Sequence, residues 1–282
     1  MIYISSSCVK HNKIKDSVQE LVDNGFENIE LSGGTEYYDG FVEDLLELKE
    51  KYSLNYTCHN YFPPPTEHFV LNLASLNDNI YTKTLKHLKK SIDLSKELGA
   101  KIFGFHAGFF IDIKVSEIGK KISKENLFDQ QKSIERFCNG YEELVKYASE
   151  VELFIENNVF SSSNFKSYNG ENFFMLTNYN DYKKLKSMID FNLLLDVAHL
   201  KVSSNTLGLD FDMEFVNMMN NSNYIHISDN DSLHDLNNKL QQNSDLVKKL
   251  SHQNLKDKNF TLEIYDEIDK IKETYRILEE II

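Results

Sequence analysis

The sequence of 282 residues contains no tryptophan and only three cysteines and three prolines. Cys8, Cys58 and Cys138 form no close pairing motif, and their odd number favours reduced thiols. No stretch joins a basic start to a long apolar run, so the sequence predicts neither a secretion signal nor a membrane-spanning helix. We therefore expect a cytoplasmic protein without a membrane partner.

Basic residues are also scarce. The 44 acidic residues outnumber the 31 basic ones, and the formal net charge is −13. A field of that sign repels polyanions. The only arginines are Arg136 and Arg276, so the chain has few of the planar groups that bind phosphate best, although a bias toward lysine would give the same shortage. Nucleic acid is therefore not an expected partner.

Short apolar runs of strand type recur along the whole chain. They are IYIS from residue 2, NIELS from 28, LNYTCH from 54, KIFGFH from 101, LFIEN from 153, NLLLD from 192, YIHIS from 224 and FTLEIY from 260. The segments between them include several, such as FVEDLLELKEKY, with helical periodicity. This alternation, without a composition break over residues 1–282, predicts a single-domain α/β fold, a (β/α)8 TIM barrel. An open doubly wound sheet is the alternative, but no glycine-rich phosphate-binding turn follows the first strand.

Two unusual loops follow predicted strands. All three prolines lie in YFPPPTEH after the third strand, and the long stretch SSSNFKSYNGENFFMLTNYN follows the fifth. Active sites of such barrels form at the carboxyl ends of the strands. We expect both loops to cover a site at that end.

Six consecutive predicted strands carry ionisable side chains at or near their ends. These are His59, His106, Glu156, Asp196 with His199, His226 with Asp229, and Glu263. One histidine at a strand end is usually a hydrogen-bonded core residue, but a barrel would bring all of these groups to one mouth, where the carboxylates repel unless cations neutralise them. Oxygen and nitrogen ligands without thiolate suit Mn²⁺, Co²⁺, Mg²⁺ or Zn²⁺, because Cys58 faces the opposite side of its strand from His59.

With these residues the chain resembles the xylose isomerase-like barrels, a family of sugar isomerases and epimerases that also includes endonuclease IV. The matching pieces are CHNYFPPP, VLNLAS, GFHAG, FIENN, LDVAHL, YIHISDND and TLEIY, of which LDVAHL and HISDN are the most specific. The resemblance implies one divalent metal ion bound by Glu156, Asp196, His226 and Glu263. It also implies that His59 and His106 match the ligands of a second zinc, and that His199 contacts substrate or a further metal.

The chain departs from the endonuclease IV pattern after HISDND. Asp235 is followed by Asn237, where that pattern has a histidine, and the glycine-rich turn that should come next is missing. A third metal site would therefore lack one ligand. The missing turn also departs from many sugar epimerases, so a substrate contact there is not carried over.

The resemblance and the charge together favour a metal-dependent isomerase or epimerase of carbohydrate metabolism that acts on a small sugar or sugar derivative. Glu156 and Glu263 are then expected to remove and return a carbon-bound proton, and His59, His106 and His199 to bind substrate. The alternatives are an endonuclease IV-like phosphodiesterase, another metal-dependent lyase or dehydratase, and a binding protein with an idle metal. The identity of the sugar and the existence of a homo-oligomer stay open.

Overall fold

The computed structural model describes residues 1–282, in which eight parallel strands close into a barrel. Each strand pairs with the next, and β8 pairs with β1. The strands are β1 (Ile2–Ser5), β2 (Asn28–Leu31), β3 (Asn55–His59), β4 (Ile102–His106), β5 (Glu152–Glu156), β6 (Asn192–Asp196), β7 (Ser222–Ile227) and β8 (Asn259–Leu262). The predicted TIM barrel and its eight strands are confirmed. The main difference is that β8 ends at Leu262, so Glu263 follows this strand instead of lying inside it.

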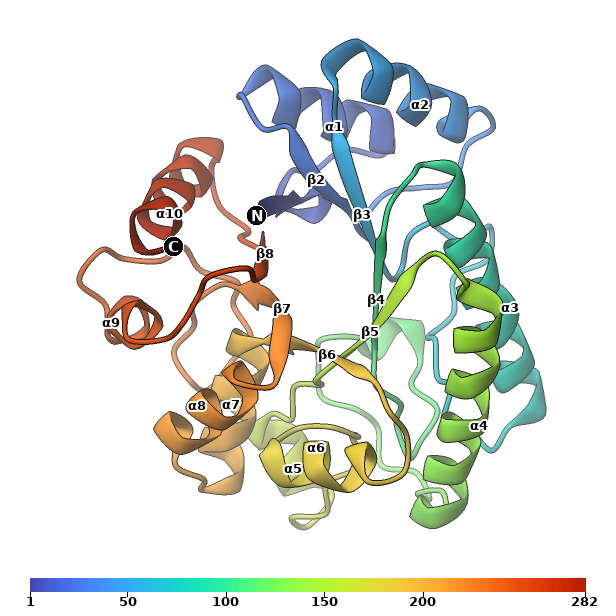
Figure 1. Ribbon diagram of the computed structural model, residues 1–282. Helices are drawn as coiled ribbons and strands as arrows, with labels where there is room; N and C mark the ends of the chain where they lie inside the picture. The colour runs from blue at the N-terminus through green and yellow to red at the C-terminus, as the bar shows by residue number, and fades with distance from the viewer.

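Helices surround the barrel (Figure 1). They are α1 (Ile14–Asp23), α2 (Phe41–Tyr52), α3 (Asp78–Glu97), α4 (Gln130–Ala148), α5 (Ser162–Ser167), α6 (Tyr179–Lys186), α7 (Val197–Leu207), α8 (Phe211–Met219), α9 (Asp245–Ser251) and α10 (Ile268–Ile281), with short 3-10 helices at Ser6–Cys8 and Val115–Glu117. In α1, for example, Ile14, Val18 and Leu21 recur at helical spacing and are fully buried. None of the helices is both long and apolar enough to cross a membrane.

Side chains fill the inside of the barrel in layers. Ile102, Phe154, Leu194 and Tyr224 form a small apolar cluster, separate from the large core between strands and helices. Two residues further along β5, β6 and β7, the same faces carry Glu156, Asp196 and His226. The alternation of the strands therefore places a polar layer above an apolar one.

Two long loops lie side by side above this polar layer. Residues 107–129 follow β4 and residues 157–178 follow β5, and they pair through Phe109 and Phe174. The sequence analysis predicts that the loop after β5 covers a site at the carboxyl ends of the strands. The loop after β4 was not singled out from the sequence, because it contains no proline and no unusual composition.

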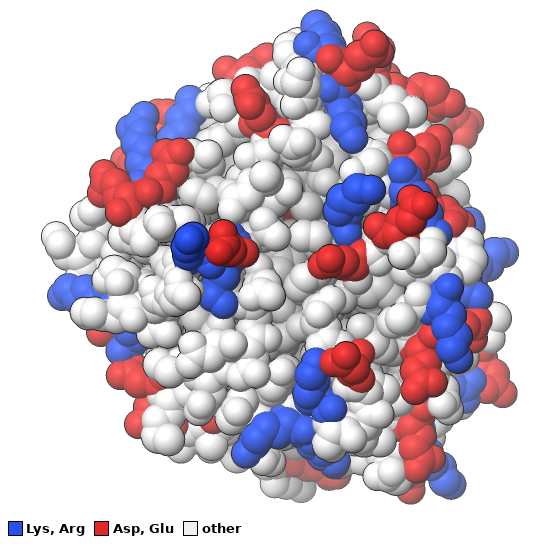
Figure 2. All heavy atoms as spheres, in the orientation of Figure 1, with Lys and Arg blue, Asp and Glu red and all other residues white.

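Charges on the face shown in Figure 2 are mixed. Acidic and basic side chains are interspersed around a largely uncharged centre, in the same orientation as Figure 1. A continuous basic surface of the kind that binds nucleic acid does not occur on this face.

Candidate active site

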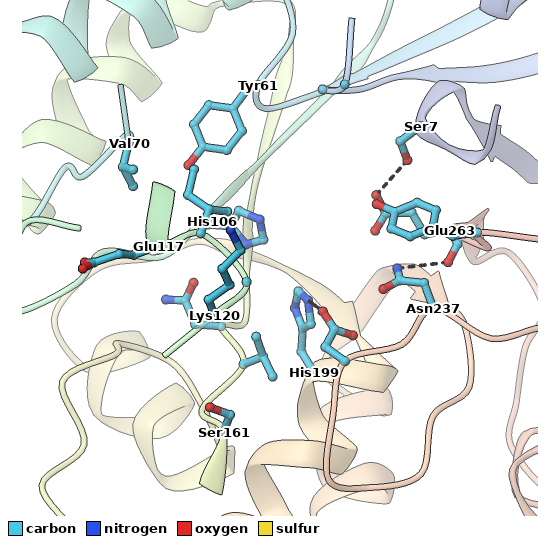
Figure 3. A pocket seen from close by; sticks show the side chains of 18 of the residues that line it. Ser7, Tyr61, Val70, His106, Glu117, Lys120, Ser161, His199, Asn237 and Glu263 are labelled. Carbon is cyan, nitrogen blue, oxygen red and sulfur yellow. Dashed lines mark hydrogen bonds and ion pairs between the residues drawn. The ribbon is translucent and has the colours of Figure 1, made fainter. Parts of the chain in front are cut away.

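A cavity of about 1160 Å³ opens where the strands end. His59, His106, His199 and Glu263 line it together, so residues distant in the sequence meet as expected. Figure 3 shows His106, His199 and Glu263 around the same open space. The loops after β3, β4, β5 and β7 supply most of the remaining wall.

Glu156 is the carboxylate around which the histidines gather. His59 Nε2 lies 2.6 Å from Glu156 Oε2, and His106 Nδ1 lies 3.1 Å from the same oxygen. Glu156 Oε1 lies 3.4 Å from His199 Nδ1 and 3.8 Å from His226 Nδ1. Glu156 itself is fully buried and does not line the cavity. It therefore lies beneath the histidines, a depth that the sequence did not predict.

Asp196, His226 and Glu263 form an adjoining group whose candidate ligand atoms all lie within 4.8 Å of one another. His226 Nδ1 is 3.5 Å from Glu263 Oε2. On its other oxygen, Glu263 accepts a hydrogen bond from Ser7 Oγ at 3.3 Å. Because His226 also approaches Glu156, the structure brings together all four residues predicted to bind one metal ion.

The geometry of α7 explains why Asp196 and His199 are three residues apart. Asp196 is the N-cap of α7, and its Oδ1 accepts a hydrogen bond from the backbone N–H of His199 at 2.7 Å. His199 Nδ1 donates to the backbone oxygen of Asn157 at 2.9 Å, since a carbonyl can only accept. His199 Nε2 is thereby directed to the cavity side, 3.2 Å from Asp235 Oδ2.

Asn237 does not take the place of the missing histidine. Its side chain Nδ2 donates to the backbone oxygen of Glu263 at 3.1 Å, as Figure 3 shows. Asp235 and His199 therefore remain as a pair. Asp229, which also follows β7, lies outside the cluster because it pairs with Lys201 at 2.6 Å.

Sequence reasoning missed two buried polar residues that contact the cluster. Asn157 binds the backbone of Asp196 twice, through Nδ2 to the carbonyl at 3.0 Å and through Oδ1 from the N–H at 2.7 Å. Glu30, on β2, lies 3.0 Å from His226 Nε2. In NIEL, the apolar Ile29 and Leu31 alternate with Glu30, and this pattern was a usable signal for an inward-facing carboxylate.

Burial and close charges perturb the ionisation of the cluster in opposite directions. Burial alone would raise the pKa of Glu156, but the imidazoles of His106 and His59 hold that pKa well below its usual value. Burial raises the pKa of Asp196 to about 7, and burial lowers the pKa of His106 to about 4. Burial therefore favours the neutral forms of Asp196 and His106. A bound cation would favour the ionised form of Asp196 and the neutral form of the imidazole, which are the forms that bind metal.

The donor atoms fit a divalent cation. Glu156 Oε1, His106 Nδ1 and His226 Nδ1 are buried and have no hydrogen-bond partner. Three overlapping groups each place three ligand atoms within 4.8 Å: His59, Glu156 and His226; His106, Glu156 and His199; Asp196, His226 and Glu263. Unpaired buried polar atoms are costly, so an oxygen- and nitrogen-rich centre of this kind is a candidate metal site.

The fold and the site together define a (β/α)8 barrel with a carboxylate and imidazole cluster at its mouth. The sequence profile described as "Xylose isomerase-like TIM barrel" matches residues 18–281, and the chain belongs to this family. No curated protein shows a significant sequence match.

Solved structures share the fold at low sequence identity. A D-tagatose 3-epimerase-like protein is 17% identical with a TM-score of 0.73, over 99% of this chain and 96% of that one. An L-ribulose 3-epimerase is 13% identical with a TM-score of 0.66, over 98% and 86% of the two chains. Endonuclease IV from Thermus thermophilus is 16% identical with a TM-score of 0.61, over 99% of both chains. At these identities the similarity establishes the fold, which this chain shares with epimerases and with an endonuclease IV.

Proposed function

We propose that the protein is a divalent-metal-dependent isomerase or epimerase that acts on a sugar or sugar derivative. The observation that carries this proposal is the position of four residues at the carboxyl ends of successive strands, with Glu156, Asp196 and His226 on β5, β6 and β7 and Glu263 directly after β8. They lie at the base of a cavity large enough for a sugar. The epimerases among the structural neighbours support the same reaction class.

Glu156, Asp196, His226 and Glu263 would hold one Mn²⁺, Co²⁺, Mg²⁺ or Zn²⁺ ion. When bound, the cation would polarise two neighbouring substrate oxygens and stabilise the enediolate charge that develops as a carbon-bound proton leaves. His59 and His106, which both contact Glu156, would suit a second zinc ion.

Two carboxylates of the chain would move the proton. Glu263 lines the cavity, and the hydrogen bond from Ser7 fixes its orientation, so it can accept a proton from a substrate carbon on its side. Glu156 lies deeper, with Oε1 free of hydrogen bonds, and would return a proton from the opposite side after taking that proton from the His59 imidazolium, whose Nε2 lies 2.6 Å from Glu156 Oε2. The proton taken up by Glu263 would then pass to solvent in the cavity. The cavity-lining His59, His106 and His199 would hydrogen-bond the substrate oxygens.

The paired loops after β4 and β5 would exclude water from this reaction. Asn164 Oδ1 accepts a hydrogen bond from Ile122 N at 2.9 Å, and Tyr168 OH donates to Ser123 O at 2.6 Å. These bonds join the two loops into one wall of the cavity. A dry site strengthens the electrostatic interactions on which proton transfer from carbon depends.

A phosphodiesterase of the endonuclease IV kind is the second candidate. His199 and Asp235 retain their contact, and three overlapping ligand groups are present, which favours more than one metal ion. Two observations disfavour the phosphodiesterase: the side chain of Asn237 donates to the backbone oxygen of Glu263, and the net charge is −13. A lyase or dehydratase would use the same groups.

The test is hydrogen exchange at carbon. The purified protein, refilled with each of the four cations, is incubated in D₂O with a panel of free and phosphorylated ketoses, and deuterium incorporation is followed by NMR. We expect incorporation into at least one sugar and a loss of about 100-fold or more in Glu263→Gln. Glu152→Gln, at the far end of β5, is the control and should exchange like the wild type. Absence of exchange with every sugar and cation would contradict the proposal.

A further inference from the structure

Glu30 is a fully buried carboxylate that the proposed reaction does not use. It extends from β2 across the inside of the barrel to His226 on β7. Its Oε2 faces three donors, namely His226 Nε2 at 3.0 Å, Thr261 Oγ1 at 3.2 Å and the hydroxyl of Tyr224. Burying a charge costs desolvation free energy even when the charge is paired, so Glu30 stabilises the fold less than an apolar residue of similar size would.

The contact with Glu30 determines which nitrogen of His226 carries a proton. An ionised carboxylate can only accept, so Nε2 is the protonated nitrogen in this hydrogen bond. The other nitrogen, Nδ1, is buried without a hydrogen-bond partner and lies 3.5 Å from Glu263 Oε2. In the neutral ring with its proton on Nε2, the lone pair of Nδ1 therefore faces the side where Glu263, Asp196 and Glu156 gather.

We propose that Glu30 is a positioning residue of the metal centre: it orients His226 so that Nδ1 faces the cation, and its charge makes the imidazole a stronger ligand. A carboxylate behind a ligating histidine fixes the ring and increases its basicity. The hydroxyl of Tyr224, which donates to the same oxygen, holds the carboxylate in place. The inference rests on the proposed metal centre.

The test compares Zn²⁺ binding in two variants that change the same hydrogen-bond network. Glu30→Gln keeps the shape of the side chain and an acceptor for His226 but removes the charge. Thr261→Val removes a different donor to the same carboxylate and leaves the contact between Glu30 and His226 in place. Competition with a chromophoric chelator gives the Zn²⁺ dissociation constants, and thermal unfolding of the chelated proteins measures stability separately.

We expect Glu30→Gln to bind Zn²⁺ about 10- to 100-fold more weakly than the wild type, with Thr261→Val close to the wild type. A purely structural role would lower the melting temperature of chelated Glu30→Gln but leave its Zn²⁺ affinity unchanged, and that result would overturn the inference while the metal centre stands. A wild-type protein that binds no Zn²⁺ would overturn both.

A measurement on the wild type covers the case in which Glu30→Gln does not fold. Long-range ¹⁵N–¹H correlation spectra of the histidine rings, recorded on chelated and Zn²⁺-loaded protein, show which nitrogen of His226 carries a proton. We expect protonated Nε2 in both samples. A neutral ring with the proton on Nδ1 and bare Nε2 would overturn the inference.

Discussion

Asp196 combines two roles that can be separated by mutation. Its Oδ1 caps α7, and its carboxylate belongs to the group with His226 and Glu263. Asparagine can also cap a helix but is a much weaker metal ligand, whereas alanine does neither.

We therefore predict that Asp196→Asn and Asp196→Ala both lose Zn²⁺ binding but differ in stability. Burial raises the pKa of Asp196 to about 7, so folding disfavours its ionised form, and removal of the charge does not lower stability near neutral pH. Asp196→Ala should be less stable than Asp196→Asn by about 1 kcal/mol, the value of the cap. Denaturant unfolding of the chelated variants measures the difference, and equal stabilities would show that the cap is unimportant.

Burial of His87, on α3, should make the folding stability of the protein sensitive to acid, independently of the metal centre. Its ring is 7% exposed, its Nε2 has no hydrogen-bond partner, and it packs edge-on against Phe69. Burial, with a smaller contribution from Lys90, lowers its pKa from 6.5 to about 4. Below pH 6.5 the unfolded chain binds a proton that the folded protein does not, so stability falls as the pH drops from 6.5 toward 4.

His87→Phe should remove this part of the pH dependence. Between pH 7.5 and pH 4.5 we expect the variant to lose about 2 to 3 kcal/mol less stability than the wild type, because each pKa unit corresponds to about 1.4 kcal/mol. Denaturant unfolding at the two pH values tests this prediction. Parallel losses in the two proteins would mean that His87 is protonated in the folded state.

The sequence allowed the cluster to be predicted, but not its depth. Strand ends of a parallel barrel meet at one mouth, so the ionisable residues at the ends of six strands could be grouped from their order alone. The choice of Glu156, Asp196, His226 and Glu263 among them came from the family resemblance. Glu30 was missed although its alternation with Ile29 and Leu31 was a usable signal for an inward-facing side chain. The register that pairs Glu30 with Ser5 and Thr57 could not be read from the sequence. The position of Glu156 beneath the histidines depends on the stagger of neighbouring strands, which a single sequence does not contain.

Among the elements, the short helix α5 contributes one of the side chains that join the two loops covering the cavity. Asn164 on α5 accepts a hydrogen bond from Ile122 N and donates one to Lys120 O at 3.4 Å. The partner segment, within residues 107–129, contains several exposed lysines. The length of residues 107–129 is visible in the sequence. The pairing of this segment with the loop after β5 is a tertiary contact, and no local sequence pattern predicts it.

Asn164→Ala should therefore loosen the cavity wall without unfolding the barrel. We expect faster tryptic cleavage at Lys120, Lys121 and Lys124, with a small change in the melting temperature, because about one hydrogen bond's worth of free energy is lost locally. Asn79→Ala, on the exposed side of α3, is the matched control. Cleavage at an unchanged rate would show that other contacts hold the loop.

For the whole molecule, net charge bears on the choice between the two proposed functions. The net charge is −13, and only lysines, among them Lys10, Lys120 and Lys121, supply positive charge at the cavity. DNA binding depends chiefly on neutralising phosphates.

We predict no cleavage of a duplex with an abasic site, even at low salt, where phosphate contacts are strongest. A nicking assay with the Zn²⁺-loaded protein is the measurement, and Glu156→Gln is its inactive control. Robust nicking by the wild type that disappears in Glu156→Gln would instead favour the phosphodiesterase.

Closure of the barrel brings residues from β5, β6 and β7 and the residue after β8 to one point, where we predict that they bind a single divalent cation. The most direct measurement is anomalous diffraction at the zinc edge from a crystal soaked in Zn²⁺. We predict a strong peak about 2.0–2.2 Å from ligand atoms of Glu156, Asp196, His226 and Glu263. Peaks found only at surface histidines such as His234, with none among these four residues, would contradict this prediction.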